Sequence, residues 1–139
     1  MDITKYPQFQ LFLLTLHLLN LKNQLIPENC DEWCVNATII NRAYYSAYMF
    51  CELWLEDIKG FKVIEPWEFQ EGEKVISEHK QVRMALSENY NQEDLGYILG
   101  KLASLRKKAD YEPFVDITNK EVSDAIGHME KIITTLKFQ

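Results

Sequence analysis

Glycine and proline are scarce in this sequence. With 5 Gly and 4 Pro among 139 residues, few of the tight turns that join β-strands can form, and no alternating apolar stretch is bounded by hairpin turn signals. Hydrophobic residues make up 47% of the chain, which is well above the content of disordered chains. A chain of this length can bury the core of one domain. We therefore expect a single all-α domain over residues 1–139.

Cysteine is also scarce. The chain has 3 cysteines, and an odd, sparse set indicates reduced thiols rather than a disulfide framework. Cys30 and Cys34 are close enough in sequence to share a helix face, but no further Cys or His follows at the spacing of a zinc site. The sequence therefore predicts neither a metal site nor a bound cofactor.

Long hydrophobic runs are missing. The run from Phe9 to Leu21 is interrupted by Gln10, Thr15, His17 and Asn20, and it is shorter than the roughly 20 apolar residues of a membrane-spanning helix. It also lacks the basic start and small-residue cleavage site of a signal peptide. Together with the reduced thiols, these features predict a cytoplasmic protein that does not associate with membranes.

Positive charge is in deficit. Lys and Arg total 15 against 21 Asp and Glu, which gives a net charge of -6 and a sequence pI near 5.1. Non-specific DNA binding requires clustered Lys and Arg to neutralise phosphates, so this class of function is disfavoured. A local basic patch remains compatible with the composition, and Arg106, Lys107 and Lys108 form a short one.

The apolar spacing predicts five helices joined by mostly short links. The links favour an antiparallel up-down bundle of four to five helices. Gly60 is expected to end the second helix, and Thr118 with Glu121 forms a capping-box pattern at the start of the last. On the third helix, Val75, Val82 and Leu86 are expected to be buried, with His79 on the same side. The predicted ranges are about 6–26, 32–58, 74–89, 93–111 and 118 onward.

The segment 61–73 is the one long loop expected between these helices. It is aromatic and acidic, with Pro66, Trp67 and Phe69. A loop of this length inside a compact domain is typically functional or mobile. The alternative is that its apolar residues cover one end of the bundle, because exposed aromatic patches are uncommon.

Two segments place polar groups where a bundle would bury them. The first is 41–48, with three tyrosines, Arg42 and Ser46, and the second is 105–111. Arg106 and Asp110 are four residues apart, so they face the same way on a helix. A buried arginine needs a partner, and we therefore predict a cross-helix ion pair between Arg42 and Asp110.

A purely structural interpretation of the same residues stays open. Tyrosines in a helical stripe usually lie in the core with the hydroxyl at the rim, and Arg106 with Asp110 is also compatible with a surface ion pair. His79 has the intrinsic pKa of an acid-base catalyst. It reaches the two segments only if its helix packs beside the helix over 93–111, and it otherwise fits a hydrogen-bonded core residue.

The residues 41–50, the pair His79-Lys80 and the segment 105–111 resemble the HEPN superfamily of small helical domains. Its members often carry an arginine-alanine-tyrosine-tyrosine stretch on a long helix. Some branches add a histidine-lysine pair and an arginine followed by alanine-aspartate-tyrosine. The resemblance implies a bundle of four or five helices, commonly a homodimer, in toxin–antitoxin, phage-defence or CRISPR-linked systems. Several such domains are metal-independent ribonucleases, often encoded beside a nucleotidyltransferase.

The sequence departs from the family at the nuclease signature, which is an arginine followed after four to six residues by a histidine. The positions four to seven beyond Arg106 hold Asp110, Tyr111, Glu112 and Pro113, and none of them is a histidine. The resemblance therefore carries over the arginine but no histidine. This matters because cleavage of RNA without a metal needs a base, an acid and a cation for the phosphate.

We therefore hold three hypotheses of function. The first is action on RNA or nucleotides in a toxin–antitoxin or phage-defence system, as a homodimer or with a nucleotidyltransferase-type antitoxin. The second is a non-catalytic nucleotide- or protein-binding module. The third is a plain helical scaffold whose acidic loop suits a basic protein partner. For the first, the candidate catalytic residues are Arg106, His79 and Asp110, and the candidate RNA- or nucleotide-binding residues are Arg42, Tyr45, Tyr111 and Lys107.

Overall fold

The computed structural model describes residues 4, 6–26, 28, 30–89, 92–112 and 116–137, and within these ranges it contains helices and no strand. The predicted all-α fold is confirmed. No helix in the described ranges is long and apolar enough to cross a membrane. Four long helices, α1 (Pro7–Asn20), α3 (Glu32–Lys59), α5 (Glu93–Tyr111) and α6 (Asn119–Lys137), are joined through the short elements α2 (Lys22–Leu25), η2 (Pro66–Glu68), α4 (Glu78–Met84) and η3 (Ala85–Asn89).

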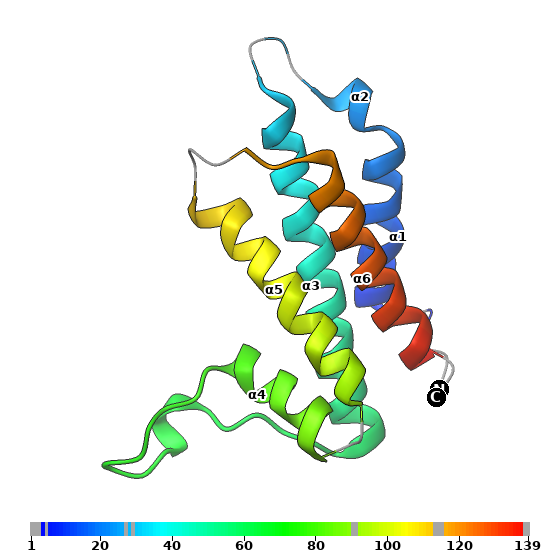
Figure 1. Cartoon of the computed structure of the whole chain (residues 1–139). Helices are drawn as coiled ribbons and strands as arrows, with labels where there is room; N and C mark the ends of the chain where they lie inside the picture. The colour runs from blue at the N-terminus through cyan, green and yellow to red at the C-terminus, as the bar shows by residue number, and fades with distance from the viewer. Residues whose placement is uncertain are drawn as a thin grey trace.

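Successive long helices run in alternate directions, so they form an antiparallel bundle (Figure 1). The longest helix, α3, packs against α1, α5 and α6. The short helix α4 lies at the end of the bundle where α3 finishes and α5 begins (Figure 1), and it contacts both of these helices. α3 therefore lies at the centre of the bundle, in contact with each of the other long helices.

Glycine ends α3 as the sequence predicts. Gly60 has a φ of 70° and lies in the left-handed region, which residues with a Cβ adopt only with strain. Its N–H donates to the Glu56 carbonyl at 3.1 Å, so it satisfies one of the free carbonyls of the last turn. The chain then leaves the helix toward the loop that precedes α4.

The predicted helix over 6–26 is shorter in the structure. α1 ends at Asn20, Leu21 breaks the helix, and α2 adds a single turn up to Leu25. Pro27, a residue type that interrupts helices, follows this segment and lies outside the described residues. Apolar periodicity continues across the break, which is why the sequence pattern did not reveal it.

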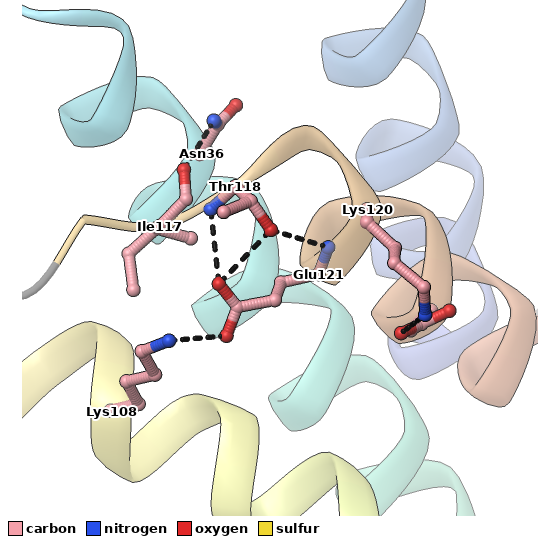
Figure 2. Close-up of polar contacts among 7 residues, drawn as sticks. Asn36, Lys108, Ile117, Thr118, Lys120 and Glu121 are labelled. Carbon is pink, nitrogen blue, oxygen red and sulfur yellow. Dashed lines mark hydrogen bonds and ion pairs between the residues drawn. The ribbon is translucent and has the colours of Figure 1, made fainter.

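The start of α6 is fixed by the predicted capping box (Figure 2). The Thr118 N–H donates to Glu121 Oε1 at 3.0 Å, and the Glu121 N–H donates to Thr118 Oγ1 at 3.2 Å. Lys108 Nζ on α5 reaches the other Glu121 oxygen at 2.7 Å. Asn36 of α3, which is buried, donates from Nδ2 to the Ile117 carbonyl at 2.8 Å. These contacts join three helices at one end of the bundle.

The helix predicted over 74–89 begins later. Ser77 is the N-cap, and its side chain accepts an N–H from the first turn of α4, which starts at Glu78. Val82 and Leu86 are buried as predicted, but Val75 precedes the helix and is 52% exposed, so its predicted burial was wrong. Its spacing matched the helical stripe, but the cap excludes it from the helix.

Part of the long loop before α4 covers one end of the bundle, which agrees with the second of its two predicted roles. Gln81 holds it down, because its Nε2 donates to the carbonyls of Ile64 and Ile76 at 2.9 and 2.8 Å. Phe61 packs against the core and covers the end of the bundle. Trp67 of η2, in contrast, is 79% exposed, so this part of the loop does not serve as a cover.

Candidate functional site

The middle of α3 and the last turns of α5 lie side by side, and an arginine from α5 meets a group of tyrosine rings there. Arg106 Cζ lies 5.2 Å from the ring centroid of Tyr44 and 5.4 Å from that of Tyr45. The ring of Tyr111, one turn further along α5, is 5.6 Å away. Guanidinium groups are attracted to the faces of aromatic rings at such distances. The two polar segments therefore share one seam.

A carboxylate links this arginine to α3. Arg106 Nη1 lies 3.6 Å from Asp110 Oδ2 and donates to the Tyr111 hydroxyl at 3.3 Å. From α3, Asn41 Nδ2 donates to both oxygens of Asp110, at 3.2 and 3.0 Å. Asp110 consequently fixes the position of the Arg106 guanidinium relative to α3.

The predicted ion pair between Arg42 and Asp110 is wrong, because the partner of Arg42 is Asn41 and not Asp110. Arg42 donates from Nε to Asn41 Oδ1 at 2.9 Å, and its Nη2 contacts the same oxygen. The Asn41 amide thus accepts from Arg42 and donates to Asp110. Neighbouring residues on a helix point about 100° apart, and here the Asn41 side chain is the one that reaches α5. Arg42 is half-buried, so it does not require an acidic partner as a fully buried arginine would.

His79 enters the same group of rings from α4. Its Nδ1 forms a hydrogen bond with the Tyr44 hydroxyl, and its ring stacks on Tyr48 at a centroid distance of 4.0 Å. Its edge faces Tyr45 at 6.1 Å. Tyr44 and Tyr45 therefore contact both His79 and Arg106. The packing of α4 beside α5, on which the involvement of His79 depended, is present in the structure.

The surroundings keep His79 neutral and Tyr44 protonated near pH 7. Burial, followed by the positive charges of Arg106 and Arg83, lowers the pKa of His79 below its ordinary 6.5. Burial raises the pKa of Tyr44 to about 12. Neutral His79 has two tautomers. In the first, Nδ1 carries no proton and the Tyr44 hydroxyl donates to it. In the second, Nδ1–H donates to the Tyr44 oxygen, which leaves Nε2 with the lone pair of a general base.

Most of the residues singled out from the sequence come together here, and one does not. The members of the cluster are Arg42, Tyr45, His79, Arg106, Asp110 and Tyr111. Lys107 is exposed and, as the next residue on the helix, points about 100° away from Arg106. Its neighbour Lys108 pairs with Glu121 instead.

Three residues of the cluster escaped individual assignment from the sequence. Tyr44 and Tyr48 stack on each other at 5.9 Å, and their i,i+4 spacing could have predicted this contact. Burial and a 2.7 Å hydrogen bond to Glu52 raise the pKa of Tyr48. Asn41 had no comparable signal, because its role depends on the register of α5 against α3.

A surface pocket of about 510 Å³ opens beside the polar network. Asn41, Arg42 and Asp110 form its polar wall, and Ala37, Thr38 and Ala109 complete its lining. The pocket brings the arginine of α3 to an accessible surface next to the residues that hold Arg106. A planar guanidinium matches phosphate oxygens in a two-bond geometry, so this surface suits a phosphate group.

Within the described ranges, no group of three or more His, Cys, Asp or Glu residues is placed to hold a metal ion. Comparisons of the chain with protein-family models, with curated proteins and with solved structures found no match.

Proposed function

We propose that the chain is a HEPN-like domain that acts on RNA or nucleotides in a toxin–antitoxin or phage-defence system, as a metal-independent ribonuclease. One observation carries the proposal: Arg106 of α5 and His79 of α4 contact the same two rings, Tyr44 and Tyr45 of α3. RNA cleavage without a metal needs a cation for the phosphate and a base for the 2′-hydroxyl. The cluster offers one group of each kind.

In the proposed reaction, Arg106 binds the non-bridging phosphate oxygens, with Arg42 and Tyr45 as further binding residues. Neutral His79 accepts the 2′-hydroxyl proton at Nε2 while the 2′-oxygen attacks phosphorus. The bond to the 5′-oxygen breaks, and the Tyr111 hydroxyl, which Arg106 holds, supplies the proton that this oxygen takes up. The products are a 2′,3′-cyclic phosphate and a 5′-hydroxyl. Asp110 orients Arg106 and does not itself transfer a proton.

The proposed assembly is a homodimer, with a nucleotidyltransferase-type antitoxin as a possible further partner, in the cytoplasm. The resemblance to HEPN domains suggests these partners. A feature of α1 supports self-association: Leu13 and Leu14 are 50% and 49% exposed on a helix whose buried residues include Phe9 and Phe12. A second copy that covered these leucines would remove apolar surface from water.

The test is RNA cleavage in the presence of EDTA. We expect the parent protein to release 2′,3′-cyclic phosphate ends. Arg106→Ala should cleave about 100-fold more slowly, as when one donor to a developing anion is lost, and His79→Ala by a similar factor, as when a general base is lost. His128→Ala, which removes a histidine of α6, is the matched control and should cleave like the parent. Absence of cleavage, or cleavage indifferent to Arg106→Ala, contradicts the nuclease proposal.

A second candidate function is a non-catalytic nucleotide- or protein-binding module. It is favoured by Asp110, which stands four residues after Arg106, pairs with it and also joins α5 to Asn41 of α3. In this case the network stabilises the bundle, and Asp110→Ala should lower the free energy of unfolding by about 1–2 kcal/mol. Nucleotide binding that depends on Arg106, without any product, would support this candidate over the nuclease.

The plain scaffold stays as a third candidate because of the loop before α4. Trp67 of η2 is 79% exposed, and Glu65, Glu68, Glu71 and Glu73 surround it in sequence. An acidic surface of this kind suits a protein partner with a basic face. Co-purification of such a partner would favour the scaffold if the Arg106→Ala substitution also has no effect.

A further inference from the structure

A second concave surface shares no lining residue with the pocket described above. It is a groove of about 440 Å³ between α4–η3 and the first half of α5, where Figure 1 shows the two segments side by side. Its lining combines basic, small and aromatic side chains, and the residues used below are Lys80, Arg83, Gly96, Tyr97, Gly100 and Lys101. We name this surface the α4–α5 groove.

Two glycines give the groove its shape. A Cβ on Gly96 would come within 1.9 Å of Ser87 Oγ and 3.0 Å of the Arg83 carbonyl oxygen, so only glycine lets α5 approach the preceding turn this closely. At Gly100 the nearest atom to such a Cβ would be Arg83 Cδ at 3.9 Å. The stem of Arg83 therefore lies above a glycine, and space remains next to it.

The groove is positively charged, although the molecule as a whole is acidic. The whole chain carries a net charge of -6, yet Lys80, Arg83 and Lys101 line the groove against a single acidic residue, Glu88. Within the described ranges, none of these three cations forms an ion pair. A local concentration of free cations on an acidic protein is the electrostatic signature of an anionic ligand.

An exposed aromatic ring accompanies these charges. Tyr97 is 66% exposed, and Lys101 Nζ lies 4.8 Å from its ring centroid. Aromatic rings next to backbone-binding cations are the usual means by which proteins hold single-stranded nucleic acid, because every base has a face that can stack. A protein helix seated on the two glycines would not need this combination.

Along α4, residues that line the groove directly follow the candidate catalytic residue His79. Lys80 follows His79 directly, and Arg83 is one turn beyond His79 on α4. Arg83 is close enough to lower the pKa of both His79 and Tyr44. Along α5, Tyr97 lies about 14 Å from Arg106, at the rise of an α-helix. A strand bound in the groove would therefore extend from the site over several nucleotides.

We propose that the α4–α5 groove binds the part of a single-stranded RNA that flanks the nucleotide at Arg106 and His79, with Lys80, Arg83 and Lys101 on phosphates and Tyr97 stacked on a base. This inference rests on the function proposed above and names its substrate as single-stranded RNA rather than a free nucleotide. RNA longer than a dinucleotide gains affinity from the groove.

The experiment compares two probes by fluorescence anisotropy: a labelled dinucleotide and a labelled single strand of about 12 nucleotides. Both are 2′-O-methylated, so neither can be cleaved. We expect the longer strand to bind more tightly. Lys101→Glu and Tyr97→Ala should each weaken its binding about tenfold and leave the dinucleotide unaffected, and Lys101→Glu should reduce the slope of log K against log salt by about 0.7. The control Lys131→Glu, an equal charge change on α6, should bind both probes like the parent.

Each other outcome has a defined meaning. Equal affinity for the two probes, or indifference to Lys101→Glu and Tyr97→Ala, overturns the groove and leaves the proposed function standing if Arg106→Ala still weakens dinucleotide binding. Absence of binding to either probe overturns both. If Lys101→Glu or Tyr97→Ala converts a dimer into a monomer in sedimentation equilibrium, the groove is a contact between copies of the chain, and the RNA assignment is wrong.

Discussion

At the residue scale, the candidate site is organised around an arginine that has rings and one carboxylate as neighbours. Arg106 lies against Tyr44, Tyr45 and Tyr111 and pairs with Asp110 at 3.6 Å. Ring faces attract the guanidinium without neutralising its charge. The arginine can therefore be held in place and still attract an anion, and its charge acts on the neighbouring histidine.

This arrangement predicts a change in the titration of His79. Burial and Arg106 together lower the pKa of His79, so Arg106→Ala should raise it toward 6.5, because one of the positive charges is removed. Titration followed by NMR of the imidazole signals measures it. His128, whose pKa is lowered first of all by burial, is the internal reference and should not respond. A pKa of His79 that stays the same in Arg106→Ala would place the two residues in separate environments.

The same shift predicts a dependence of stability on pH. The folded pKa of His79 lies below its ordinary 6.5, so between the two values the unfolded chain binds more protons than the folded one. The contribution of His79 to the free energy of unfolding should therefore rise with pH through this window and be complete above 6.5. Urea denaturation at several pH values, compared with His79→Gln, measures it, and an equal pH dependence in the two proteins would contradict it.

At the element scale, the ends of the helices set the geometry of the site. Gly60 turns the chain out of α3, Ser77 starts α4 with His79 in its first turn, and Thr118 with Glu121 starts α6. The glycine and the capping box were predictable because they are local patterns. The later start of α4 was not, because apolar spacing continues through the segment that precedes Ser77.

A pair of glycine substitutions tests this account of the helix ends. Gly60→Ala should lower the free energy of unfolding by about 1 kcal/mol, because a Cβ strains the left-handed conformation at φ 70°. Gly127→Ala within α6, where a Cβ meets nothing within 4 Å, should raise it by about 0.5–1 kcal/mol through helix propensity. Urea denaturation of both variants measures the difference, and equal effects of the same sign would refute it.

At the scale of the whole molecule, α3 brings the site together by contacting α5 and α4 at the same level. The sequence predicted which segments would meet, because polar residues in apolar stripes need partners from another helix. It could not predict that Asn41 rather than Arg42 would reach Asp110, or that His79 would join Tyr44. Both depend on the rotation and register of neighbouring helices, which residue spacing along one helix does not determine.

The central claim is that Arg106 and His79, from different helices, form one phosphate-binding site. The most direct test is an NMR titration with cytidine 3′-monophosphate, which follows the imidazole signals of His79 and His128. We predict that the nucleotide shifts the His79 signals and not those of His128, that bound phosphate raises the pKa of His79, and that Arg106→Ala weakens the response at least tenfold. His79 signals that do not move at millimolar nucleotide, or that move equally in Arg106→Ala, would contradict the claim.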